Sequence, residues 1–170
     1  MFKVKLSMRV SVIAALMLAP ALAHSQRPLI DGIDRSAAKP ASVVFLYPEQ
    51  VTIPAGKPAK ITLHFRVAPG LHINSHTPTA VELIPTVFTI PADSGVQLIA
   101  VSYPPGAAFT LPLDPSTTLS VYSGEFTLQA RFRAVPGNHL VEATLHYQAC
   151  DNNTCMPPKA IPVVIDVIGK

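Results

Sequence analysis

The chain has two cysteines, Cys150 and Cys155, separated by the four residues Asp151–Thr154. Two thiols at this spacing can meet across a tight loop, and a disulfide between them would close a ring of about six residues. The entropy model gives so short a ring only about 2 kcal/mol of stabilisation, against roughly 4.7 kcal/mol for a 100-residue loop. The spacing therefore favours a disulfide that opens and closes in use, and a structural hairpin disulfide is the alternative.

The residues around the cysteine pair offer little to activate a thiolate. Lys159 is the nearest cation, and Asp151 would disfavour a second negative charge. His146 precedes Cys150 by four residues, which along a strand is roughly 13 Å and too far for direct action. The pair also lacks the helix-terminal Cys-x-x-Cys pattern of a thioredoxin. We therefore predict a passive electron carrier, and a cysteine hydrolase is disfavoured.

His72 and His76 form the other candidate site. At this spacing on a helix, both side chains would lie on one face as metal ligands. Gly70 and Pro78 favour a turn or an extended segment instead, in which the two rings would not converge. Met156 could in principle join the cysteines in a soft copper site. The preferred interpretation is a loop shaped by hydrogen-bonding histidines, so we expect neither a metal nor a cofactor.

Residues 1–25 have the order of a secretory signal peptide. Met1–Arg9 is basic without an acid, Val10–Ala19 is apolar, and residues 21–25 offer small-x-small cleavage patterns. The apolar run of about ten residues is too short for a bilayer, which needs roughly 20. Residues 26–40 are polar, contain two prolines and show no period, which indicates a flexible leader. We predict a periplasmic protein without membrane insertion after cleavage, in a compartment where cysteines form disulfides.

Charge and length limit the function classes further. The chain has 13 Lys and Arg against 10 Asp and Glu, and three of the basic residues lie in the predicted signal peptide. The mature protein is then neutral, and its Lys and Arg are scattered, which argues against a nucleic-acid partner. The remaining length fits a single domain, predicted over residues 41–170.

Short β-like runs separated by Pro and Gly begin at Ala41. Apolar and polar residues alternate strictly along several of these runs, which is typical of half-buried strands. The predicted strands are Ser42–Tyr47, Lys60–Ala68, Val96–Tyr103, Glu125–Val135, His139–Cys150 and Ala160–Ile168. The predicted core face comprises Ile61, Leu63, Phe65, Val67, Phe126, Leu128, Ala130, Phe132, Val141, Ala143, Leu145, Tyr147 and Ala149. The pattern predicts an all-β, immunoglobulin-like antiparallel β-sandwich, with a closed barrel as the alternative.

The cysteine segment resembles a known family. Tyr147–Cys150 and Cys155–Pro158 are similar to the Tyr-Gln-Gly-Cys and Cys-Tyr-Pro-Pro segments of the N-terminal periplasmic domain of the thiol:disulfide interchange protein DsbD. Pro69–Pro78 and Val121–Glu125 look like two further segments of this family. The resemblance covers roughly residues 41–168, in family order.

This resemblance implies an immunoglobulin-like domain that carries a redox dithiol. Such domains take electrons from a membrane-embedded reductant and pass them to thioredoxin-fold proteins of the periplasm, as a component of a protein-disulfide reductase. By this resemblance Cys155 forms the mixed disulfide with a partner and Cys150 resolves it. The sequence ends at Lys170, without the further domains of full-length DsbD, so we expect the electron donor to be a separate protein.

The resemblance also implies a cap loop that shields the disulfide with an aromatic residue before a Tyr-Gly pair. Val121 and Tyr122 occupy that place, and a serine intervenes before the glycine. Leu119 and Ser120 stand where the family has acidic residues. Shielding and carboxylate-assisted proton transfer are therefore expected to differ from the family pattern, and Tyr122 could serve either the cap or the core.

Overall fold

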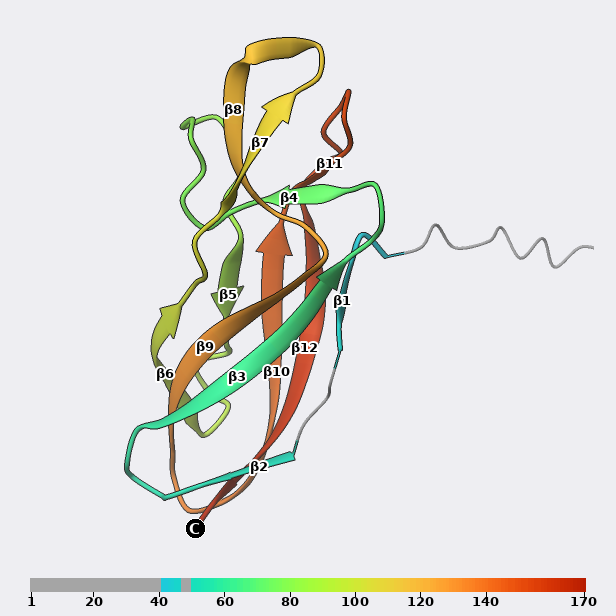
Figure 1. The fold of residues 1–170 in the computed structure, drawn as a ribbon. Coiled ribbons are helices and arrows are strands. Elements are labelled where there is room, and N and C mark those ends of the chain that lie inside the picture. The colour runs from blue at the N-terminus through green and yellow to red at the C-terminus, as the bar shows by residue number, and fades with distance from the viewer. Residues whose placement is uncertain (1–40, 47–49) are drawn as a thin grey trace, which may run out of the picture. The chain divides into compact units, whose positions relative to one another are not determined.

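The computed structural model describes residues 41–46 and 50–170, and this part of the chain forms twelve strands and no helix. The predicted signal peptide and leader, residues 1–40, lie outside the described residues, as does the last residue of the predicted strand Ser42–Tyr47. The strands (Figure 1) are β1 Val43–Phe45, β2 Gln50–Ile53, β3 Ala59–Val67, β4 His72–Asn74, β5 Val87–Thr89, β6 Val96–Ser102, β7 Ala107–Leu111, β8 Asp114–Tyr122, β9 Glu125–Ala134, β10 Gly137–Tyr147, β11 Ala149–Cys150 and β12 Lys159–Gly169.

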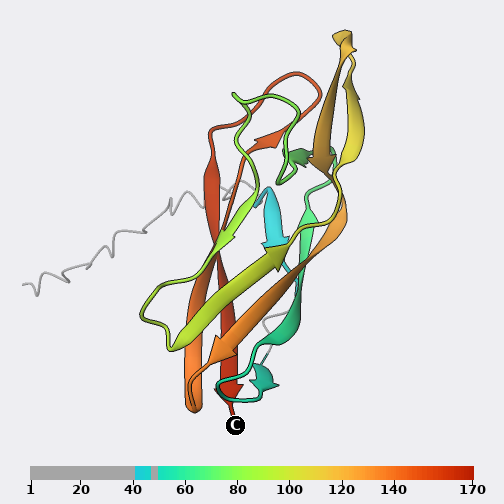
Figure 2. The same cartoon turned by 90° about the vertical axis from the view of Figure 1, so that its left-hand side faces the viewer.

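Two four-stranded sheets make up the sandwich. One has the order β1-β3-β9-β6 and the other the order β2-β12-β10-β5. Neighbouring strands are antiparallel, except that β2 runs parallel to β12. In Figure 1, β3 and β9 cross in front of β10 and β12, and the side view in Figure 2 shows the two pairs as separate layers. Buried side chains of both sheets form one hydrophobic cluster, and the fold is the predicted all-β, immunoglobulin-like sandwich.

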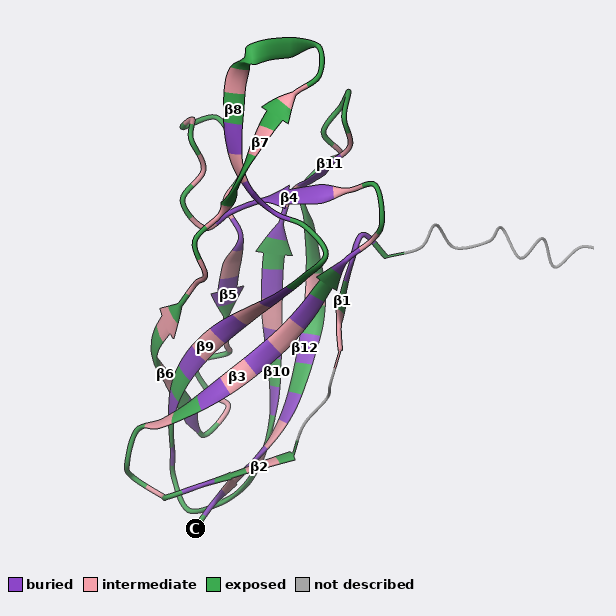
Figure 3. Ribbon diagram, in the orientation of Figure 1, coloured by how far each residue is buried: buried purple, intermediate pink, exposed green. Residues whose placement is uncertain are grey.

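The alternation of side chains along the long strands is confirmed. Every residue of the predicted core face is buried, and the most exposed of them, Phe126, has only 8% of its surface accessible. Figure 3 shows buried and more exposed positions alternating along β3, β9, β10 and β12. Successive side chains of a strand point to opposite faces, so one apolar face is enough to anchor each strand against the other sheet. Full burial of a large apolar side chain stabilises the fold by about 1.5–3 kcal/mol.

The predicted strand His139–Cys150 needs correction, because it is two strands in two sheets. β10 ends at Tyr147, and β11 pairs with β4 instead of β12. The change occurs at Gln148, whose carbonyl accepts a hydrogen bond from the backbone N–H of Asn74 at 3.3 Å. A continuous strand would have turned Cys150 to the outer face, whereas the change of sheet buries both Ala149 and Cys150.

A third sheet, of order β11-β4-β8-β7, lies at one end of the sandwich (Figure 1). Its strands continue from the main sheets, because β3 leads into β4, β8 leads into β9 and β10 leads into β11. Gly70 and Gly124 make two of these connections, each at positive φ, which a side chain would disfavour. No strand is predicted from the sequence for β4, β7 or β8, because β4 is short and the outer part of the β7–β8 hairpin is exposed. This end sheet carries Cys150.

Candidate functional site

Cys150 and Cys155 are joined by a disulfide, with their Cα atoms 4.0 Å apart. The intervening turn is held by the side chain of Asp151. Its Oδ1 accepts hydrogen bonds from the backbone N–H groups of Asn153, at 2.7 Å, and Thr154, at 2.8 Å. An Asp that bonds to the backbone two residues on is a common way to make a turn. The local sequence itself therefore brings the two sulfurs together.

The side chain of Gln148 ties this loop to the end sheet. Its Nε2 donates to the carbonyl of Met156 at 3.2 Å, and its Oε1 accepts from Nδ2 of Asn74 at 3.3 Å. The backbone N–H of Met156 also donates to the carbonyl of Ala149 at 2.8 Å. The residues on either side of the disulfide loop are thus hydrogen-bonded to each other, and Gln148 is also bonded to β4.

The two cysteines differ in access. Cys150 is 2% exposed and is held in the β11–β4 ladder, whereas Cys155 is exposed and follows the turn outside the named strands. A protein that approaches this end of the sandwich can reach Cys155 first. Cys155 is therefore the more accessible of the two cysteines.

A groove of about 550 Å³ lies beside the disulfide. Four parts of the chain line it: the disulfide loop, β4, the loop that precedes β5 and the β7–β8 hairpin. Its lining includes both cysteines, His72, Glu82, Leu83, Leu111, Asp151 and residues 117–119. The lining of the groove combines apolar side chains with the carboxylates of Glu82 and Asp151 and the imidazole of His72.

His72 is the residue of this groove whose place the sequence did not predict. It lies in β4 directly opposite Cys150, is 3% exposed, and its ring centroid is 4.2 Å from that of Phe109. Burial lowers the pKa of His72, and the negative charge of Asp151 opposes this effect. Within the described residues, Nε2 of His72 has no hydrogen-bond partner. A buried ring nitrogen without a hydrogen-bond partner calls for a functional explanation.

His76 has different surroundings from His72. Its ring stacks on that of Tyr103 with centroids 3.7 Å apart, and its Nδ1 lies 2.9 Å from the carbonyl oxygen of Thr86. The segment that holds both histidines is a short strand followed by a bend and not a helix. In the described part of the chain, no group of three or more His, Cys, Asp or Glu residues is placed to bind a metal ion.

Val121 and Tyr122 end β8 and are both buried. The hydroxyl of Tyr122 accepts a hydrogen bond from the backbone N–H of His76 at 3.1 Å and donates one to the carbonyl of Pro104 at 3.0 Å. The Tyr122 ring also stacks on Phe126. Neither Val121 nor Tyr122 lines the groove, whereas residues 117–119 of the same strand do. A cap function of these two residues stays a prediction, and residues 117–119 are the part of β8 beside the disulfide.

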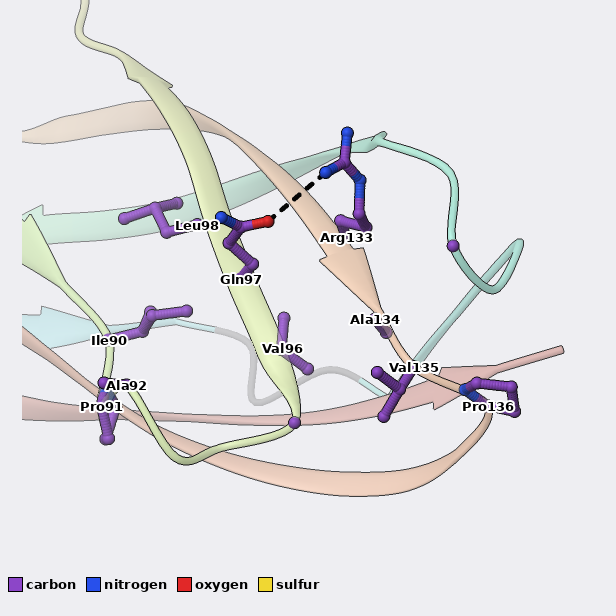
Figure 4. Close-up of a pocket in the computed structure, with 12 residues that line it drawn as sticks. Ile90, Pro91, Ala92, Val96, Gln97, Leu98, Arg133, Ala134, Val135 and Pro136 are labelled. Carbon is purple, nitrogen blue, oxygen red and sulfur yellow. Dashed lines mark hydrogen bonds between the residues drawn. The ribbon is translucent and has the colours of Figure 1, made fainter.

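A larger hollow, of about 660 Å³, lies near the start of β6 and the turn between β9 and β10 (Figure 4). Its one charged side chain is Arg133, which donates a hydrogen bond to Gln97, and its lining includes neither Cys nor His. The whole length of β10, 11 residues, separates this turn from β11. The hollow is therefore remote from the disulfide and offers no group for its chemistry.

Comparison with known families matches residues 42–164 to the N-terminal domain of the thiol:disulfide interchange protein DsbD. The chain belongs to this family. The match includes both cysteines and every segment that lines the groove, so the disulfide and the family together fit thiol–disulfide exchange in general.

Solved structures of this kind include the reduced N-terminal domain of DsbD from Neisseria meningitidis. It is 22% identical, with a TM-score of 0.46 over 68% of this chain and 82% of that one. The N-terminal periplasmic domain of ScsB from Proteus mirabilis is 16% identical, with a TM-score of 0.49 over 72% of this chain. The chain spans 43% of that ScsB structure. No curated protein matches the sequence. Among the residues described, no helix is long and apolar enough to cross a membrane.

Proposed function

We propose that this DsbD N-terminal family member carries electrons in the periplasm by thiol–disulfide exchange through Cys150 and Cys155. Its partners are thioredoxin-fold proteins, and a separate membrane reductant supplies the electrons. The domain that does this spans residues 41–170, and residues 1–25 direct its export and are cleaved. The observation that supports the proposal is the unequal access of two bonded cysteines, one exposed on a loop and one held in a sheet.

The exchange follows from this geometry in two steps. The Cys155 thiolate attacks the disulfide of an oxidised partner, which forms a mixed disulfide and releases one partner thiolate. Cys150 then attacks the sulfur of Cys155, which restores the intramolecular disulfide and releases the second partner thiolate. Two electrons pass from the dithiol to the partner. The membrane reductant then reverses both steps and regenerates the dithiol.

Two exposed apolar side chains, in segments that also line the groove, support a protein partner. Val81 is fully exposed in the loop between the groove residues Ala80 and Glu82, and Leu113 is 79% exposed in the β7–β8 turn. Exposed apolar groups around a reactive centre offer contact area for a protein that must dock before it exchanges disulfides. They fit a transient partner better than a small-molecule substrate.

A trapping experiment tests the proposal. Cys150→Ser leaves Cys155 able to form a mixed disulfide that nothing resolves, so it should accumulate adducts in a periplasmic extract. Cys155→Ser is the matched control, because its remaining thiol is buried, and it should trap little. Adducts are resolved on a non-reducing gel and identified by mass spectrometry. Equal trapping by both variants would refute the division of roles, and no trapping by either would count against electron transfer.

The competing function is a non-catalytic binding module whose disulfide is structural. The two functions differ in the reduction potential of the pair, measured in glutathione redox buffers by alkylation and mass spectrometry. A structural disulfide should lie below about −300 mV, whereas a working carrier should lie above that value. A potential below it, together with an absence of trapped adducts, would favour the binding module.

A further inference from the structure

Cys150 and His72 are directly opposite each other in the antiparallel β11–β4 ladder. Residues opposite each other in such a pair project to the same face, with Cβ atoms about 4.5–5.5 Å apart. Both residues line the groove beside the disulfide. The imidazole and the buried sulfur of Cys150 therefore lie on the same face of the end sheet, beside the groove.

Cys150 is buried and Cys155 is exposed, and this difference affects how readily each thiol loses its proton. Burial disfavours the charged thiolate, so a thiol in this position gives up its proton less readily than an exposed one. Resolution of a mixed disulfide nevertheless requires the thiolate, which is the attacking species. A base beside Cys150 would remove this obstacle.

We propose that His72 is the base that accepts the proton of Cys150 when this thiol resolves a mixed disulfide held on Cys155. The inference rests on the proposed function and deepens it, because it assigns a catalytic residue to the resolving step. Nε2 of His72, buried and without a hydrogen-bond partner among the described residues, is available to accept that proton.

The step balances in protons and electrons. The proton of Cys150 passes to neutral His72, and the thiolate attacks the sulfur of Cys155. The bond from Cys155 to the partner sulfur breaks, and the partner leaves as a thiolate that carries the electron pair. The proton on His72 then passes to that leaving thiolate or to water, which returns the imidazole to its neutral form. No further oxidant or reductant is needed.

The surroundings of His72 suit this exchange of a proton. The charged groups that line the groove are Asp151, from the disulfide loop, and Glu82, from the loop before β5, whereas β7 and β8 contribute only Leu and Thr side chains, with Phe109 against the ring. Burial lowers the pKa of His72, which keeps the ring neutral and able to accept a proton near pH 7. The negative charge of Asp151 favours the imidazolium that forms.

The test uses the reduced protein and the small aromatic disulfide dithiobis(nitrobenzoate), whose release of coloured thiolate is followed by stopped flow. The first release reports attack by one cysteine, and the second reports resolution of the mixed disulfide by the other. Cys150→Ser identifies the phases, since it should give the first release without the second. The reagent replaces the protein partner, so this result is independent of whether any partner is trapped.

His72→Phe should slow the second release by about tenfold or more near pH 7 and leave the first release unchanged. The difference in second-release rate between this variant and the wild type should shrink as the pH rises toward the range where thiols ionise without a base. His72→Gln is a second variant that keeps a polar side chain, and His146→Phe, which alters an exposed histidine of β10, is the matched control. Second-phase rates equal to the wild type in a folded His72 variant, over about pH 6–9, would overturn the proposal.

The pH dependence of the second release in the wild-type protein is a further test. It stays informative even if both His72 variants fail to fold. If His72 is the base, the rate of the second release should rise at low pH as the imidazole becomes neutral. The rate should then stay level until the pH at which thiols ionise without a base. A rate that rises about tenfold per pH unit throughout, without such a plateau, would contradict a role for His72.

Discussion

Cys150 and Cys155 are bonded to each other, yet Cys150 is buried in the end sheet and Cys155 is exposed on the loop. This difference in exposure follows from the strand and the turn that hold the two cysteines. β11 holds Cys150 against β4, while the turn after Asp151 folds the chain back and places Cys155 beside Cys150, outside the named strands and exposed. In the proposed function, the exposed sulfur of Cys155 meets the partner protein and the buried sulfur of Cys150 performs the internal step.

The first prediction concerns the reactivity of the two thiols after reduction. With limiting iodoacetamide, Cys155 should be alkylated about tenfold or more faster than Cys150, because thiol reactivity depends on exposure. Peptide mass spectrometry at short times gives the two rates. The same protein in denaturant is the control, and there the rates should be similar. Faster modification of Cys150 in the folded protein would contradict the arrangement of the loop.

The second prediction concerns the contribution of the disulfide to stability. The variant with both cysteines changed to Ser should stay folded, with a free energy of unfolding lower by about 2 kcal/mol, because the bridge closes only a short ring. Hydrogen bonds from Gln148 and Met156 hold the base of the loop without the bridge. Urea denaturation followed by circular dichroism measures the change. A variant unfolded at room temperature would show that the bridge is structural.

The third prediction is a pH dependence of stability caused by His72. Burial lowers its pKa below the ordinary value of 6.5, so the unfolded chain takes up this proton at a higher pH than the folded protein. The contribution of His72 is therefore present above about pH 6.5 and is lost as the pH falls through the lowered folded-state pKa.

His72→Phe should remove this contribution, so its denaturation midpoint should fall less than that of the wild type between about pH 7.5 and pH 5.5. His146→Phe should keep the wild-type dependence, because His146 is exposed. Identical pH profiles for the wild type and His72→Phe would show that burial does not disfavour the charged form of His72.

The fourth prediction separates the two roles considered for Tyr122. Tyr122→Phe should lower the free energy of unfolding by about 1–3 kcal/mol, because the backbone N–H of His76 and the carbonyl of Pro104 lose their partner. It should leave both phases of exchange with the small disulfide unchanged. Ser123→Ala, an exposed neighbour, controls for a general effect of the site. Unchanged stability with faster exchange would instead make Tyr122 part of a cap.

Local patterns in the sequence were sufficient for the sandwich and for the cysteine loop. The alternation along Lys60–Ala68 and Glu125–Val135 assigned the core faces of β3 and β9, because a period of two leaves one apolar face that must be buried. The polar turn Asp151–Thr154 between the cysteines brought them together through hydrogen bonds within the loop itself. Both features depend on residues close in sequence, which is why they could be predicted.

Tertiary structure decided the burial of Cys150, the position of His72 and the groove. The sequence period continues from Tyr147 to Cys150, but the chain changes sheets at Gln148 because its backbone and side chain bond to Asn74 of β4. That pairing joins segments far apart in the chain, and packing of the whole end sheet sets its register. No local period encodes such a register, so the opposition of Cys150 and His72 became visible only in the folded protein.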